Sequence, residues 1–169
     1  MAELTPRERL QPSLLDRLTD EEPGKRHEGA ELRVLSPQRL RESVRRDLTW
    51  LFNTSNLATV TDLSEYPEVE RSTLNYGIPD LAGRTASGVD PVALVRLLRQ
   101  AIWDFEPRLL RETVKVQVLA DDEQCNPNAL SFAIEAELWS QPVPLRLYLR
   151  TDLNLEDGEA RVVELTAEQ

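Results

Sequence analysis

Two segments repeat apolar residues with the period of an amphipathic helix. In the first, about residues 37–53, Leu40, Val44, Leu48 and Leu51 recur on one face. Ser36 is a suitable N-cap and Pro37 suits the first helical position. Asn53-Thr54-Ser55-Asn56 ends this helix. The pattern therefore predicts a helix that buries one side.

The second helical segment has equally clear boundaries. Asp90 caps it, Pro91 begins it, and Pro107 ends it by disfavouring helical geometry at Glu106. One broad apolar face is predicted from Leu94, Leu97, Leu98, Ala101, Ile102 and Phe105. Between the two helices lies a long connection, residues 61–88, which we expect to have a function or to cover the core.

After Pro107 the period changes from 3.6 to 2, which is typical of half-buried strands. Alternation predicts strands over 114–118, 130–138 and 143–149, with a weaker fourth over 159–165. The turns would lie at 126–128, 141–142 and 157–158. On the outward face, Glu135 and Glu137 could oppose Arg146 and Arg150. The fold class is α+β: two main helices on one face of a mainly antiparallel three- to four-stranded sheet.

Residues 1–36 are predicted to form an extended N-terminal arm and linker that precedes a single domain, residues 37–169. Within the arm, Ser13 can cap a helical turn with Leu14, Leu15 and Leu18, and residues 23–29 read as a polar linker. So short a helix needs external contacts. Either the leucines pack on the chain's own domain or they dock on a partner.

The net charge of −10 changes the picture of possible partners. An acidic chain lacks the basic face that nucleic acid or an anionic membrane would need. We therefore expect no nucleic-acid partner. The acidic C-terminal half fits a basic protein partner or a simply solvated face. The N-terminus is charged where a signal peptide is apolar, and no apolar run approaches about 20 residues, so a cytoplasmic protein without membrane insertion is expected.

Candidate catalytic chemistry is sparse in the sequence. The single histidine, His27, lies in the polar arm, and the single cysteine, Cys125, follows three acidic residues that disfavour a thiolate. One Cys and one His do not make an ordinary zinc site, and no phosphate-binding glycine loop is present, so we expect no cofactor. Paired carboxylates remain possible, because the chain has 30 acidic residues.

Glu106-Pro107-Arg108 stands out at the junction between helix and sheet. Pro107 constrains the backbone between two opposite charges, and an Arg fork binds carboxylates bidentately. Two interpretations are open. The charges could contact another chain from an accessible position, or they could form internal salt bridges where the helix ends.

Four segments resemble the baseplate wedge family of contractile phage tails, especially its type VI secretion branch, TssE. They are, in chain order, residues 13–18, residues 43–54, residues 75–81 and Phe105-Glu106-Pro107-Arg108-Leu109. Leu14, Leu15 and Leu18 look like that branch's N-terminal signature, and Glu106, Pro107 and Arg108 match the family's Glu-Pro-Arg signature.

The resemblance implies a non-enzymatic role in assembly. Such proteins join baseplate wedges with TssF and TssG, and offer a template for the first ring of the TssB–TssC sheath, so an exposed strand edge could accept a neighbour's strand. The resemblance therefore makes Glu106, Pro107, Arg108, Leu14, Leu15 and Leu18 candidate partner-binding residues. The alternatives are a peptidoglycan hydrolase that uses paired carboxylates, and a wedge protein of a phage-derived tail.

Overall fold

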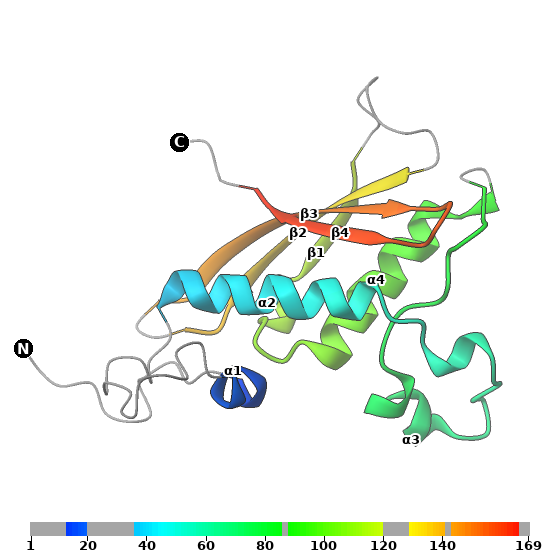
Figure 1. Cartoon of the computed structure of the whole chain (residues 1–169), viewed down its shortest axis with the longest axis horizontal. Coiled ribbons are helices and arrows are strands. Elements are labelled where there is room, and N and C mark those ends of the chain that lie inside the picture. Colours follow the sequence, from blue (N-terminus) through cyan, green and yellow to red (C-terminus); the bar gives the residue numbers. More distant parts are fainter. Residues whose placement is uncertain (1–12, 20–35, 86–87, 120–128, 141–142, 166–169) are drawn as a thin grey trace, which may run out of the picture.

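Two long helices and one four-stranded sheet form the centre of the structure (Figure 1). The computed structural model describes residues 13–19, 36–85, 88–119, 129–140 and 143–165. The predicted linker at 23–29, the turns at 126–128 and 141–142, His27 and Cys125 lie outside the described residues.

Both helices form where the apolar period predicts them. Helix α2 spans Pro37–Phe52, and the Ser36 hydroxyl accepts a hydrogen bond from the Arg39 N–H at 3.2 Å. Helix α4 spans Pro91–Phe105, and the Asp90 carboxylate accepts one from the Val92 N–H at 2.9 Å. These side chains satisfy N–H groups that a helix start leaves unpaired.

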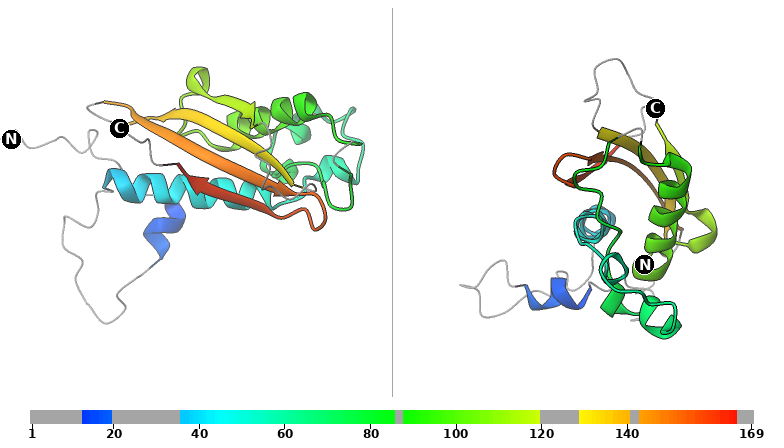
Figure 2. Two further views of the ribbon diagram at one scale, coloured as in Figure 1. Left: turned by 90° about the horizontal axis from the view of Figure 1, so that it is seen from above. Right: turned by 90° about the vertical axis from the view of Figure 1, so that its right-hand side faces the viewer.

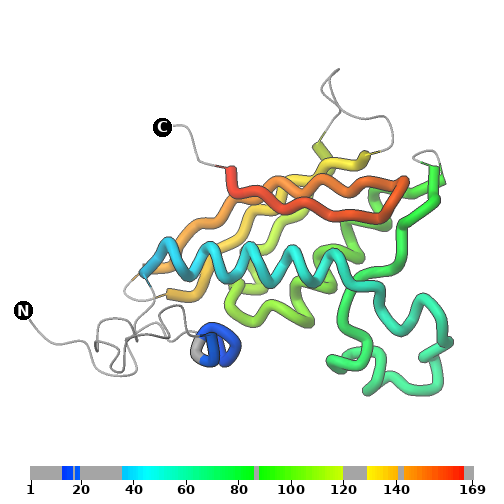
Figure 3. Tube along the Cα trace, in the orientation of Figure 1, coloured from blue at the N-terminus to red at the C-terminus, as the bar shows by residue number. Residues whose placement is uncertain are grey.

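The sheet is an antiparallel meander with strand order β1-β2-β3-β4. Its strands are β1 Lys115–Val118, β2 Ala129–Leu138, β3 Leu145–Asn154 and β4 Ala160–Glu164. Both helices lie on the same face of the sheet, and α2 runs along β4 (Figures 2 and 3). The α+β prediction is therefore confirmed.

The core fills the space between this sheet face and the two helices. Its largest fully buried side chains are Leu48, Leu51, Phe52, Leu94, Leu98, Ile102, Phe132, Ile134, Leu138, Leu147, Leu149 and Leu153. Burial of each such side chain stabilises the fold by about 1.5–3 kcal/mol. The other sheet face carries the polar side chains of the alternating strands and is not covered by either helix.

The long connection between the helices is organised by short elements. These are η2 Leu57–Thr59, α3 Pro67–Glu70 and η3 Thr73–Asn75. Gly77 has φ +120°, and a Cβ there would lie 2.1 Å from the Thr54 carbonyl oxygen. The Ile78 N–H donates to this same carbonyl at 2.9 Å, so a glycine is needed where the connection returns to the end of α2.

Three details of the sequence prediction were wrong. Leu97 is 44% exposed, because α4 packs mainly on β1 and its buried face is narrower than expected. Val143 is exposed and precedes β3, which begins at Leu145. Glu135 does not oppose an arginine on β3, because the register places it opposite Tyr148. It forms an ion pair with Lys115, its partner on β1, at 3.7 Å, and Arg150 forms one with Asp152 at 2.8 Å. The pair Glu137–Arg146 is confirmed, at 3.9 Å.

Candidate partner-binding site

The Glu106-Pro107-Arg108 corner joins the end of α4 to the sheet. Glu106 leaves helical geometry, with φ −122° and ψ 78°, although its N–H still bonds the Ile102 carbonyl at 2.9 Å. After the corner, the Trp139 N–H donates to the Arg108 carbonyl at 2.8 Å and ties the chain to the end of β2. Pro107 disfavours a further helical turn, so the corner is fixed at both ends.

The Glu106 carboxylate points inward and receives the Arg108 fork. Glu106 is 4% exposed. Arg108 Nε donates to Glu106 Oε1 at 2.7 Å and Arg108 Nη2 to Glu106 Oε2 at 2.5 Å. The Arg108 backbone N–H also donates to Oε1, at 3.1 Å. A buried carboxylate is thus fully partnered, as burial of a charge requires.

Arg108 also joins this corner to α2. Its Nη2 donates to Asp47 Oδ2 at 2.5 Å and its Nη1 to the Ser43 hydroxyl at 3.2 Å. Burial alone would lower the pKa of Arg108, but Glu106 and Asp47 raise that pKa well above its ordinary value. The guanidinium therefore remains a cation that holds helix, corner and sheet together.

The charge network continues outward to the short helix α1, Leu14–Leu18. Arg46 forms two ion pairs: its Nη2 lies 2.8 Å from Asp47 Oδ1, and its Nη1 lies 2.6 Å from Asp16 Oδ1. The Ser13 hydroxyl accepts a hydrogen bond from the Asp16 N–H at 3.3 Å and caps α1, as predicted. Acidic and basic side chains thus alternate along a continuous set of ion pairs, which we call the charge network: Glu106, Arg108, Asp47, Arg46 and Asp16.

The leucines of α1 are exposed, although Leu15 also lines a groove against the domain. Leu14 is 70% exposed, Leu18 is 74% exposed and Leu15 is 45% exposed. Helix α1 therefore lies against the chain's own domain without burying these three side chains in its core. The contact of α1 with α2 is instead mainly polar, through Asp16 and Arg46.

A groove of about 430 Å³ lies between α1 and the corner. Its aromatic wall contains Tyr76, Phe105 and Trp50. The rings of Tyr76 and Phe105 meet edge to face with their centroids 5.2 Å apart. The guanidinium carbon of Arg46 lies over the Trp50 ring, 5.0 Å from its centroid. Ser13, Leu15, Pro107 and Arg108 also line it. Burial raises the pKa of Tyr76, as do Asp47 and Glu106, so its hydroxyl stays neutral.

The expectation that the Glu106 and Arg108 charges are readily accessible was wrong for Glu106. Within the chain, Glu106 and Arg108 form the internal salt bridge that the second interpretation describes. Pro107 is nevertheless exposed, and a quarter of the Arg108 side chain remains accessible to a partner. Sequence reasoning missed the partners Asp47 and Ser43. The available signal was their spacing of four residues along one flank of the apolar face of α2.

Other site chemistry is limited in the part of the chain that the structure describes. There, no group of three or more His, Cys, Asp or Glu side chains is placed to hold a metal ion. Among the described residues, no helix has the length and apolar character needed to span a membrane.

Fold and site together define a small α+β protein whose best-organised site is a charge network between helices and sheet, beside a groove with aromatic walls. Residues 38–143 match the model of a known family, the baseplate wedge protein gp25. That range covers well over half of the chain, and the chain belongs to this family. No curated protein and no solved structure matches it.

Membership assigns the chain a structural role. Proteins of this family are baseplate wedge components of contractile tail-like machines, and their partners are other baseplate and sheath proteins. The matched range includes α2 from its second residue, α4, the Glu106-Pro107-Arg108 corner, β1 and β2, whereas α1, β3 and β4 lie outside it.

Proposed function

We propose that this chain is the TssE component of a type VI secretion baseplate. In this proposal it is a non-enzymatic cytoplasmic protein that joins the wedge with TssF and TssG and provides the start of the TssB–TssC sheath. The observation that carries the proposal lies outside the matched range. Residues 13–18, which resemble the secretion branch, form a capped helix that exposes Leu14, Leu15 and Leu18.

Exposed leucines on a tethered helix are suited to a partner's apolar groove. Side chains at positions four apart lie on one face, so Leu14 and Leu18 can enter such a groove together. We assign residues 1–36 to a docking arm and residues 37–169 to the wedge domain. The arm would provide the apolar part of the contact with TssF or TssG.

The corner would provide the polar part of the contact. Glu106 holds the Arg108 fork from within, and Pro107 presents an exposed ring beside the groove. We therefore separate the roles of the three residues. Pro107 and the accessible side of Arg108 would touch the partner, whereas Glu106 would act by positioning Arg108.

Co-expression with TssF and TssG tests the proposal. The full chain should recover both proteins in affinity purification. A variant with Leu14→Ser, Leu15→Ser and Leu18→Ser should recover at least about tenfold less, because loss of even one buried leucine contact, about 1.5–3 kcal/mol, weakens binding by about tenfold or more. A variant with Leu97→Ser, which changes an exposed leucine elsewhere, is the matched control.

The outcome also distinguishes the secretion machine from a phage-derived tail. If the chain fails to bind TssF and TssG but binds the wedge proteins of a phage-type tail, the assignment to type VI secretion is wrong. If the triple leucine variant and the wild type recover equal amounts of TssF and TssG, the proposal that the arm docks on these partners is wrong.

A direct assay tests the proposed lack of enzymatic activity. The purified protein should release no more soluble peptidoglycan than a buffer control. Release that disappears on changing one specific Asp or Glu would instead support the hydrolase alternative, since paired carboxylates are the one catalytic chemistry that the sequence leaves open.

A further inference from the structure

The connection between α2 and α4 has two parts that pack differently. Its second part joins the core, because Ile78 and Leu81 are buried in the main apolar cluster. Its first part, residues 56–76, contains η2, α3 and η3 and projects from the end of α2, away from the sheet (Figures 1 and 2). These three elements mainly contact one another, and Leu63 is buried apart from the main cluster. We call residues 56–76 the acidic lobe, because of the charges described below.

Hydrogen bonds of one buried amide give the acidic lobe a defined shape. Asn75 Oδ1 accepts from the Ala58 N–H, and Asn75 Nδ2 donates to the Glu70 carbonyl, both at 2.9 Å. A side-chain amide offers a donor and an acceptor together, so Asn75 joins η2, the end of α3 and η3. The lobe is thus ordered by polar contacts, and its order does not require burial of its larger apolar side chains.

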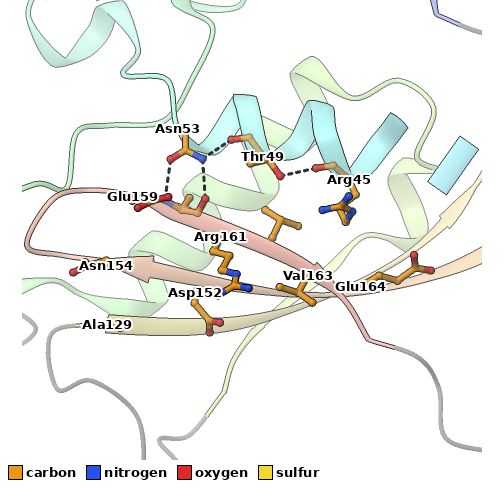
Figure 4. Close-up of a pocket in the computed structure, with 12 residues that line it drawn as sticks. Arg45, Thr49, Asn53, Ala129, Asp152, Asn154, Glu159, Arg161, Val163 and Glu164 are labelled. Carbon is orange, nitrogen blue, oxygen red and sulfur yellow. Dashed lines mark hydrogen bonds between the residues drawn. The ribbon is translucent and has the colours of Figure 1, made fainter. Parts of the chain in front are cut away.

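Both ends of the acidic lobe are fixed to the rest of the domain. Just before the lobe, Asn53 joins the end of α2 to β4 (Figure 4). Its Oδ1 accepts from the Ala160 N–H at 2.9 Å and its Nδ2 donates to the Ala160 carbonyl at 2.8 Å. Just after the lobe, the Ile78 N–H donates to the Thr54 carbonyl at 2.9 Å. The lobe is therefore held in a fixed position at the end of α2.

Large apolar side chains are exposed on each of the three short elements. Val60, which follows η2, is 81% exposed, Leu74 in η3 is 71% exposed, and Tyr66 at the start of α3 is 57% exposed. Several exposed apolar side chains on one ordered loop are typical of an interaction surface. The lobe thus leaves three large apolar side chains available to a partner.

The acidic lobe also carries a formal charge of −3, from four carboxylates and one guanidinium. The carboxylates belong to Asp62, Glu65, Glu68 and Glu70. All four are exposed, and none forms an ion pair with another described residue. Such a surface repels nucleic-acid phosphates and anionic lipids and is complementary to Lys and Arg side chains. The charge therefore favours a protein partner with a basic segment.

The acidic lobe is continuous with the groove beside the corner. Tyr76, the last residue of the lobe, belongs to the aromatic wall of that groove and meets the Phe105 ring. Trp50, near the end of α2, lines the same groove. A partner that occupies the groove would therefore reach the lobe next.

We infer that the acidic lobe binds a basic amphipathic segment of the partner that occupies the groove. Apolar side chains of this segment contact Val60, Tyr66 and Leu74, and its Lys or Arg side chains face the carboxylates. The identity of the partner, TssF or TssG, rests on the proposed function. The chemistry of the segment rests on the lobe alone.

A change of two apolar side chains tests the contact, with the purified TssF–TssG complex as the probe. In the full chain, Val60→Ser with Leu74→Ser should weaken equilibrium binding by about tenfold or more, because both contacts with the partner are lost. The matched control is Val92→Ser with Leu97→Ser, which changes two exposed aliphatic side chains on α4 and should bind within about twofold of the wild type. Thermal melting of both variants establishes that they fold.

A reversal of two charges tests the predicted basic segment. Glu65→Lys with Glu68→Lys should slow association with TssF–TssG by about tenfold at low salt, and the difference should shrink as the salt concentration rises. Glu112→Lys with Glu159→Lys changes the net charge equally at exposed positions outside the lobe, so it is the matched control. Equal slowing by the two pairs would mean that binding responds only to net charge, which overturns the inference.

Cross-linking identifies the segment directly. A photoreactive phenylalanine analogue in place of Tyr66 should cross-link to TssF or TssG in the purified complex, and the same analogue in place of Leu97 should not. The cross-linked peptide should contain Lys or Arg beside apolar residues. An acidic peptide, or equal cross-linking from both positions, contradicts the predicted contact.

The outcomes separate the inference from the proposed function. If the wild type binds TssF–TssG and both lobe variants bind equally well, the inference is wrong and the proposed function stands. If the wild type does not bind TssF–TssG, the proposed function and the inferred partner are both wrong. If the lobe variants instead lose binding to a wedge protein of a phage-type tail, the lobe contact is supported and the secretion assignment is wrong.

Discussion

The two segments predicted to bind partners use their side chains in opposite ways. In the corner, Glu106 is turned inward and meets the Arg108 fork, so a charge is buried. In α1, three leucines remain exposed, and the polar residue Asp16 makes the contact with the domain. The comparison teaches that residue type alone does not say which side of a segment is available to a partner.

Each arrangement has a physical reason. The Glu106 carboxylate tolerates burial because three hydrogen bonds from Arg108 satisfy it. Helix α1 has only five residues, which is too short to be stable alone, and its ion pair with Arg46 gives it a docking point without covering the leucines. At one end of the charge network, the buried charge of Glu106 stabilises the fold. At the other end, the ion pair of Asp16 holds α1 in place while its leucines stay exposed.

The largest effect should come from Glu106→Gln. The change removes the charge opposite Arg108 and leaves a mostly buried guanidinium with one carboxylate fewer, so we expect a loss of about 2–4 kcal/mol in the free energy of unfolding. For a chain of this size, the melting temperature should fall by roughly 5–15 °C. Glu112→Gln, at an exposed position, is the control and should change it little. Equal melting temperatures for the two variants would mean that the corner does not brace the fold.

Asp47→Asn should have the next largest effect. Asp47 accepts from Arg108 and also pairs with Arg46, so its loss weakens the network in both directions. We expect about 1–3 kcal/mol of destabilisation by chemical denaturation. In a double-mutant cycle with Glu106→Gln the two losses should be non-additive, because both carboxylates contact one guanidinium. Strict additivity would show that the two contacts are independent.

A smaller effect is expected at Asp16, and it depends on pH. Burial alone would raise the pKa of Asp16, but hydrogen bonds from Arg46 and Ser13 and the charge of Arg46 lower it below its ordinary value of 3.8. A pKa that is lower in the folded state means that the contact stabilises the docking of α1 above pH 3.8. This stabilisation is lost as the pH falls through the lower, folded-state pKa.

Hydrogen exchange in α1 measures this docking. Asp16→Asn should speed exchange of the α1 amides at neutral pH, while the melting temperature changes by less than about 3 °C. The variant should also lose the acid dependence of protection, which is the exchange rate relative to the intrinsic rate of an unprotected amide at the same pH. The same acid dependence in wild type and variant would assign the titration to another group.

The smallest effect on stability should follow the triple change Leu14→Ser, Leu15→Ser and Leu18→Ser. These side chains are largely in solvent, so the melting temperature should stay within about 2 °C of the wild type in a calorimetric scan. A fall of about 10 °C or more would show that the leucines belong to the domain's own core. In that case the contrast between the two segments would disappear.

Sequence patterns predicted the parts of the fold that depend on local order. The apolar period, Ser36, Asp90 and Pro107 act over a few residues, and both helices agree closely with them. Strand alternation likewise predicted the meander. The short helices η2 and η3 were missed, because three residues are too few to show a period.

The candidate site depends on contacts between distant segments, which local patterns do not contain. Arg108 and Asp47 are 61 residues apart in the chain, and Arg46 and Asp16 are 30 apart. Which carboxylate meets which guanidinium follows from the packing of α2 against α4 and the sheet. The corner could therefore be located from the sequence, whereas the burial of Glu106 could not.

The amide of Asn53 has a consequence for the time before assembly, when copies of the chain meet only one another. A bare strand edge invites self-association, and two β4 strands could pair along their whole length. Because Asn53 covers Ala160, the length available for such pairing is restricted to the remainder of a five-residue strand. One side chain at the end of α2 thus shortens the strand edge along which two copies of the chain could pair.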